Sequence, residues 1–185
     1  MIDDAHAEME ASMKKSVDAL RKDLNRIRTG RASLALLDGI MVDYYGSSTP
    51  INQLASLSIP EPRQIVIQPW DSQAIQDIEK ALHKSELGLT PMNDGKVIRI
   101  SLPPLTAERR KELVKVVRKM GEEFKVQIRN HRRDANDLLK DLKKEKEISE
   151  DEQRKGQERI QKTTDQYIAK VDEVVAEKEA EIMEI

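Results

Sequence analysis

Hydrophobic residues recur at steps of three and four along three long segments of the chain, a spacing that predicts helices with one buried stripe each. The first segment spans residues 3–29 and ends at Gly30, and the second begins near residue 105. The third begins near Ser149, which forms an S-x-x-E capping box with Glu152. None of these stripes can be buried by its own helix, so the three helices are predicted to form one extended bundle.

The predicted core of this bundle follows directly from the stripes. Each helix contributes one set of apolar or core-compatible residues at helical spacing. The three sets are Ala5, Met9, Met13, Val17, Leu20, Leu24 and Ile27 on the first helix, Leu113, Val117, Met120, Phe124, Ile128, His131, Ala135, Leu138 and Leu142 on the second, and Ile160, Thr163, Tyr167, Val171, Val174 and Ile182 on the third.

The pattern changes between the first two helices, where short β-branched runs alternate with Gly and Pro. These runs predict strands, and a helix capped by Asp71 or Ser72 is predicted among them. The predicted strands cover 40–45, 64–68 and 96–102, and the predicted helix covers 72–86. The fold class is therefore α+β, with a small β/α/β domain inserted into a long three-helix bundle.

Such an insertion is held by two connections, which divide the chain into a bundle of residues 1–30 and 105–185 and an inserted domain of residues 31–104. Glycine permits a bend, paired prolines stiffen a returning strand, and Thr106 can cap the second helix. We expect hinges near 29–32 and 102–106, and an L-shaped molecule. The expected hinge residues are Gly30, Arg31, Pro103, Pro104, Leu105 and Thr106.

Charge changes the picture of the second helix. The whole chain has a net charge of −2, but residues 105–145 alone carry thirteen Lys or Arg and eight Asp or Glu, which gives +5. At about 100° per residue most of these cations share one stripe, and most of the acids lie on another. A sorted basic stripe is typical of a surface that binds a polyanion.

The densest part of the basic stripe is a group of three arginines, Arg129, Arg132 and Arg133, because an arginine fork matches phosphate oxygens. Arg118 and Lys125 belong to the same stripe and are further candidates for RNA binding. The alternative is a solvated face with ion pairs between neighbouring turns, such as Arg133 with Asp137. Arg28 and Arg31 flank Gly30 and could contact a partner or pair with carboxylates of the inserted domain; the residues leave both open.

Other chemistry finds little support. The chain has no cysteine, no apolar run long enough for a membrane span and no signal-peptide pattern, so we expect a cytoplasmic protein. No catalytic motif is present, no metal or cofactor is expected, and the histidines lack a second ligand one turn away: His6, His83 and His131. The aromatic residues Trp70, Tyr44 and Tyr45 are interpreted as packing residues. A helix-binding adaptor or chaperone is the alternative function, and an enzyme comes third.

Several sequence strings resemble bacterial ribosome recycling factors over the whole length of the chain. They are I-R-T-G-R-A-S at 27–33, L-D-G at 37–39, Y-Y-G at 44–46, L-P-P-L-T at 102–106, R-R-K at 109–111, R-N-H-R-R-D-A-N at 129–136 and K-E-I-S-E at 146–150. His131 departs from the family, which more often has an aliphatic residue there.

This resemblance implies a tRNA-like, L-shaped, monomeric and non-enzymatic protein. It implies action with elongation factor G and GTP to split the post-termination ribosome into subunits. The bundle would bind large-subunit ribosomal RNA through Arg129 and Arg132, with Arg133, Arg28 and Arg31 as weaker candidates. The inserted domain would move when the GTPase pushes it.

Overall fold

The structure, a computed structural model, describes residues 1–85 and 88–184. It contains two compact units. One joins Met1–Thr29 with the segment from Ala107 to Glu184, and the other spans Gly30–Thr106. Each unit has its own core and is described by itself.

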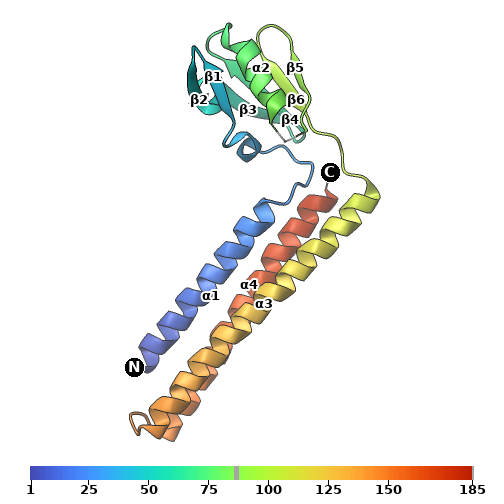
Figure 1. Cartoon of the computed structure of the whole chain (residues 1–185). Coiled ribbons are helices and arrows are strands. Elements are labelled where there is room, and N and C mark those ends of the chain that lie inside the picture. Colours follow the sequence, from blue (N-terminus) through green and yellow to red (C-terminus); the bar gives the residue numbers. More distant parts are fainter. Residues whose placement is uncertain (86–87, 185) are drawn as a thin grey trace. The chain divides into compact units, whose positions relative to one another are not determined.

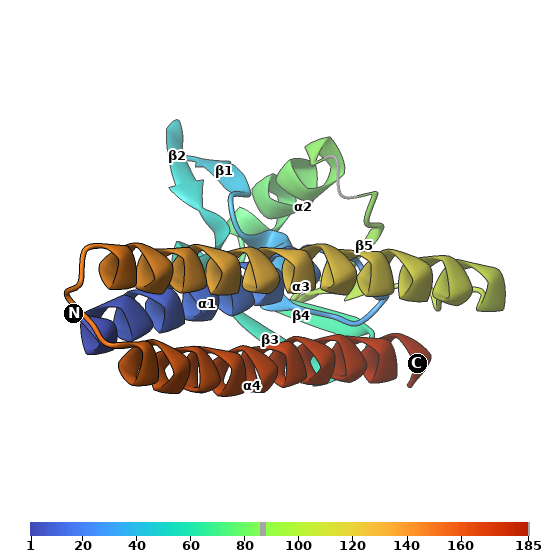
Figure 2. The same ribbon diagram turned by 90° about the horizontal axis from the view of Figure 1, so that it is seen from below.

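The first unit is a bundle of three helices, α1 (Ile2–Asn25), α3 (Ala107–Lys144) and α4 (Glu150–Met183). They lie side by side along their lengths in both views (Figures 1 and 2). The predicted stripe of α4 is buried throughout, and so are the α1 residues from Ala5 to Leu24 that were assigned to its core. The capping box at Ser149 is confirmed: its hydroxyl accepts the Glu152 N–H at 3.2 Å, and its own N–H donates to the Glu152 carboxylate at 2.7 Å.

Two details of the predicted helices are wrong. α1 ends at Asn25, four residues before the predicted end, because the N–H groups of Arg26 and Ile27 bond back three residues and tighten the last turn. On α3, Leu138 is 43% exposed while Leu139 is fully buried. The buried stripe continues from Ala135 to Leu139, a step of four residues. The prediction took a step of three, from Ala135 to Leu138, and this reaches a residue on the solvent side of the helix.

The second unit is a small α+β domain (Figure 1). A hairpin of β1 (Met41–Tyr44) and β2 (Ser47–Pro50) accompanies a four-stranded antiparallel sheet in the order β3-β4-β6-β5. The sheet strands are β3 (Ala55–Glu61), β4 (Gln64–Pro69), β5 (Pro91–Asn93) and β6 (Ile98–Ser101). Helix α2 (Ala74–Lys84) and two short 3₁₀ turns, η1 (Leu34–Leu37) and η2 (Ile51–Gln53), complete the unit.

The core of this unit is aliphatic. Alternate residues of β4 and β6 point to one side and are buried, together with the inner face of α2: Ile65, Ile67, Ile98, Ile100, Ile75, Ile78 and Leu82. The three predicted strands and the helix are confirmed in type and place. The helix begins at Ala74 rather than 72, and residue 86, its predicted last, lies outside the described residues. β2, β3 and β5 were missed.

Candidate nucleic-acid interface

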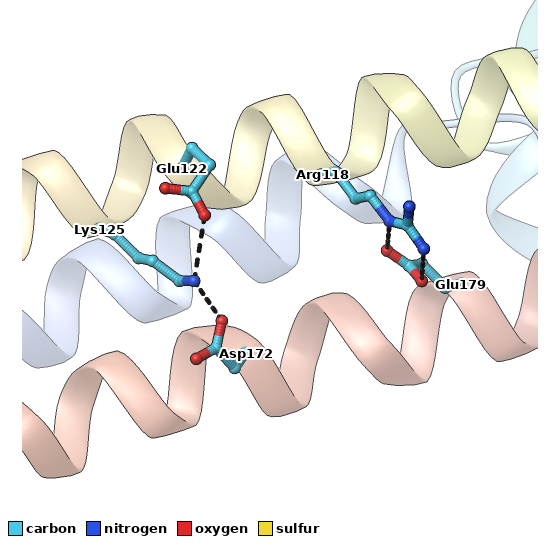
Figure 3. Close-up of polar contacts among 5 residues, drawn as sticks. All are labelled: Arg118, Glu122, Lys125, Asp172 and Glu179. Atoms are coloured by element: carbon cyan, nitrogen blue, oxygen red, sulfur yellow. Dashed lines mark hydrogen bonds and ion pairs between the residues drawn. The ribbon is translucent and has the colours of Figure 1, made fainter.

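The basic stripe of α3 is partly neutralised inside the bundle. Arg118 donates from Nε and Nη2 to the two carboxylate oxygens of Glu179 on α4, at 2.7 and 3.2 Å. Lys125 contacts Glu122 at 3.1 Å and also pairs with Asp172 of α4 (Figure 3). The hydrogen bond to Asp172 raises the pKa of Lys125, and that to Glu179 raises the pKa of Arg118. Both cations therefore already have carboxylate partners.

This pairing makes these two residues less available to an external anion than the charge pattern of α3 alone suggests. The Lys125 side chain is only 16% exposed, so it presents little of its charge to an external phosphate. Arg118 is more exposed, but an external ligand would have to replace a two-bond carboxylate contact. The acids of α4 that neutralise them are distant in sequence, so the charge pattern of α3 alone could not reveal them.

The three central arginines differ from these residues. Arg132 Nη1 donates to the neutral amide oxygen of Gln161 at 3.3 Å. Within the described part of the chain, Arg129 and Arg133 have neither a carboxylate nor a hydrogen-bond partner. Arg133 is exposed, and Arg129 and Arg132 are half-buried. The guanidinium groups at this level of α3 thus keep their full charge and most of their donors for an external ligand.

The other two predicted arginines lie elsewhere. The Ser16 hydroxyl meets His131 Nε2 at 3.1 Å, so the arginine level of α3 packs against the middle of α1. Arg28 is exposed beyond the end of α1, and exposed Arg31 belongs to the second unit. We call Arg129, Arg132 and Arg133 the α3 arginine cluster.

The connections between the units are short and anchored. On the bundle side, the Thr29 hydroxyl donates to Glu181 of α4 at 3.1 Å. In the second unit, the Ala32 N–H bonds the Pro62 carbonyl at 2.7 Å and the Leu102 N–H bonds the Arg63 carbonyl at 2.8 Å, so both connections meet the β3–β4 turn. Gly30, with φ of +75°, lies between Thr29, which is bonded to the bundle, and Ala32, which is bonded to the second unit. Residues 30–31 therefore lie between bonded residues on the first connection.

Sites for other chemistry are poor. A shallow hollow of about 210 Å³ lies between α1 and α3, and its lining includes apolar residues such as Met9 and Leu138 and the acids Glu8 and Asp134. Residues 1–85 and 88–184 contain no group of three His, Cys, Asp or Glu side chains that could hold a metal ion. In the same residues no helix is both long and apolar enough to cross a membrane.

One interpretation of the sequence fails in the second unit. Tyr45 is 74% exposed and Trp70 is 70% exposed, so they are not packing residues. Tyr44, by contrast, is half-buried and packs against the core, as expected. Large aromatic residues are buried in most folded domains, and nothing in the local sequence distinguishes these two from the others.

The fold and the site define an α+β protein in which a three-helix bundle carries, on α3, a group of arginines without carboxylate partners among the described residues. Comparison with known proteins makes this specific. The family model "Ribosome recycling factor" matches residues 20–183. The ribosome-recycling factor of Syntrophobacter fumaroxidans is 60% identical over 185 residues, covering all of both chains.

Solved structures agree. A solution structure of the ribosome recycling factor matches with a TM-score of 0.74 and 47% identity, over 100% of this chain and 98% of the other. Models for the T. thermophilus ribosome recycling factor and the E. coli elongation factor G bound to the E. coli post-termination complex match with a TM-score of 0.62 and 48% identity, over 98% of both chains. The chain belongs to the ribosome recycling factor family.

Proposed function

We propose that this chain binds the post-termination ribosome and, with elongation factor G and GTP, promotes its dissociation into subunits. The relative seen with elongation factor G on the post-termination complex covers nearly the whole chain, and this supports the assignment. The protein acts as a non-enzymatic factor, and GTP hydrolysis belongs to the GTPase. Because its proposed substrate is the bacterial post-termination ribosome, we place the protein in the bacterial cytoplasm.

The observation that carries the mechanism is the α3 arginine cluster. A bundle that neutralises Arg118 and Lys125 with its own carboxylates leaves Arg129, Arg132 and Arg133 available to an external anion. Ribosomal RNA offers phosphates and base faces, both of which guanidinium groups bind well. We assign large-subunit RNA binding to this cluster, with Arg28 and Arg31 as additional contacts.

The first prediction compares two sets of α3 residues. Arg132→Ala and Arg129→Ala should each weaken binding to isolated large subunits by about 1–3 kcal/mol, the range for a charge-assisted hydrogen bond. Arg118→Ala is the matched control and should change the affinity much less, because that side chain is occupied by Glu179. Binding is measured by sedimentation with fluorescently labelled protein.

Salt and subunit splitting complete this test. Binding through several phosphates should weaken steeply as salt rises, whereas an apolar protein interface would be far less sensitive. Wild-type affinity in both Arg129→Ala and Arg132→Ala would rule out the cluster as the RNA-binding surface. If the wild-type protein, elongation factor G and GTP leave post-termination ribosomes intact in a sucrose gradient, the proposed function itself is wrong.

A further inference from the structure

Two ion pairs join α3 to α4 at a regular interval. Arg118 pairs with Glu179, and Lys125 pairs with Asp172 (Figure 3). The two cations are seven residues apart on α3, and the two acids are seven residues apart on α4, in the opposite direction. Seven residues are nearly two turns of an α-helix, so these side chains repeat along one edge of each helix. The next step of this series should therefore hold a third pair of facing side chains.

That step is occupied by Arg132 and Asp165, which have opposite charges but do not pair. Within residues 1–85 and 88–184, neither of them has an ion-pair partner. Both instead contact Gln161, which lies one turn before Asp165 on α4. Gln161 Oε1 accepts a hydrogen bond from Arg132 Nη1 at 3.3 Å, and Gln161 Nε2 donates to Asp165 Oδ1 at 2.8 Å. A neutral side chain thus links two charges that would otherwise complete the series.

The chemistry of the three groups fixes the orientation of this amide. A guanidinium only donates hydrogen bonds and an ionised carboxylate only accepts them, whereas an amide does both. Turning the Gln161 amide over would set its donors against the guanidinium and its oxygen against the carboxylate. Gln161 therefore satisfies one bond of Arg132 and one of Asp165 without neutralising either charge.

This arrangement matters for the availability of Arg132. Arg118 shows the alternative, since its guanidinium is held by Glu179 through two bonds of 2.7 and 3.2 Å. A phosphate that binds such an arginine must first replace a carboxylate. Arg132 is restrained by only one hydrogen bond to a neutral oxygen, so its other donors remain for an external anion.

We propose that Gln161 is a positioning residue, which occupies Asp165 and so keeps Arg132 available to phosphate. The inference rests on the proposed function, because the phosphate is taken to be that of large-subunit RNA. Asp165 is the competing carboxylate. Without the amide, it completes the third ion pair of the α3–α4 series and withdraws Arg132 from the α3 arginine cluster.

The first test measures the affinity for isolated large subunits. Gln161→Leu removes both hydrogen bonds at similar side-chain size and should weaken binding about two- to fivefold, which corresponds to the strength of an exposed ion pair. Adding Asp165→Asn should restore the affinity, because the competing carboxylate is then gone. A loss that persists in the Gln161→Leu, Asp165→Asn protein would overturn the proposal.

Two controls separate competition from other effects. Glu158→Gln removes the same charge from an exposed acid seven residues earlier on α4, and it should not restore binding to Gln161→Leu. Equal restoration by Glu158→Gln would mean that only net charge matters, and this overturns the proposal. In an Arg132→Ala background, Gln161→Leu should cause no further loss. A further loss there would show that Gln161 does not act through Arg132.

The closing experiment needs no ribosome. Thermal unfolding of Arg132→Ala, Asp165→Asn and the double variant measures the coupling between these two side chains. The coupling should be close to zero with Gln161 present and should reach about 1–3 °C in Tm in the Gln161→Leu background, as expected for an exposed ion pair in a chain of this size. No coupling in that background overturns the proposal. A wild-type protein that does not bind large subunits contradicts the proposed function instead.

Discussion

His6 is a titratable side chain in the core of the bundle. Its Nε2 lies 2.8 Å from the Thr163 hydroxyl of α4. Burial lowers the pKa of His6, the Arg159 charge lowers it further, and Glu10 and Asp3 offset this only in part. The folded protein therefore favours the neutral imidazole.

The stability of the protein should consequently fall in mild acid. The unfolded chain takes up a proton at a pKa of about 6.5, before the folded His6 does. The free energy of unfolding should therefore decrease as the pH drops below about 6.5, until the folded His6 also titrates. Urea unfolding at pH 7.5 and 5.5 should show a larger difference for the wild type than for His6→Gln. An equal difference in both proteins would exclude His6 as the source.

Gly121 is a close-packing residue on α3. A Cβ atom there would lie 2.6 Å from Cγ2 of Val175 on α4, which is closer than two carbon atoms can approach. Exposed Gly→Ala changes in helices stabilise by about 1 kcal/mol, but overpacking costs about 1–3 kcal/mol, so Gly121→Ala should destabilise the bundle.

The same residue pair offers a sharp control. In a Val175→Ala background the obstructing methyl groups are gone, so Gly121→Ala should become neutral or stabilising, and the double-mutant cycle should show a favourable coupling. Thermal unfolding followed by circular dichroism measures all four proteins. A destabilisation that persists in the Val175→Ala background would mean that the clash with Val175 is not the cause.

Among the elements, long periodic helices could be predicted and short strands could not. Twenty or more residues of period 3.6 leave little ambiguity, which is why the stripe of α4 and the stripe of α1 from Ala5 to Leu24 agree with the buried residues, whereas Ile27 lies beyond the end of α1 and is half-buried. β3 contains alternating Ser and a Pro near its end, and β5 has three residues, so neither carries a pattern that differs from a loop. These strands form because the neighbouring β4 and β6 offer hydrogen-bond partners, which is information from tertiary structure.

The start of α4 allows a prediction at the scale of one element. Ser149→Ala removes the hydroxyl that accepts the Glu152 N–H and should cost about 1 kcal/mol of stability. Ser149→Asp keeps an acceptor and a favourable charge at the helix N-terminus, so it should remain close to the wild type. Chemical denaturation compares the three proteins. An equal loss in both variants would indicate that the hydroxyl is not the stabilising group.

At the scale of the whole molecule, the sequence predicted which face of α3 is basic but not which of its cations are available. Arg118 and Lys125 looked equivalent to Arg132 because the neutralising carboxylates, Glu179 and Asp172, lie more than forty residues away in the chain. Only the packing of α4 against α3 brings them together. The hinge near Gly30 and the two prolines stays a prediction, made because glycine permits backbone angles that other residues avoid and proline restricts them.

We propose that the two connections form a hinge whose motion is needed to split ribosomes but not to bind them. Thr29 is anchored to the bundle, and Ala32 and Leu102 are anchored to the second unit, which places the proposed hinge between Thr29 and Ala32 on one connection and beyond Leu102 on the other. Gly30 has positive φ, and a Cβ there would lie 3.3 Å from the Leu105 side chain. Any side chain at this position restricts the dihedral angles that the bend can use.

Gly30→Val should therefore lower the rate of subunit splitting with elongation factor G and GTP, while the affinity for large subunits stays near the wild-type value, because the α3 arginine cluster is untouched. Gly95→Val is the matched control. Gly95 has φ of +90° with open space around it, so the variant has comparable backbone strain without altering a connection.

Because the native chain has no cysteine, spin labels at Ser48→Cys and Glu158→Cys can report the distance between the units. The distance distribution should narrow in Gly30→Val and not in Gly95→Val. Normal splitting by Gly30→Val despite a narrowed distribution would show that motion about Gly30 is not part of recycling.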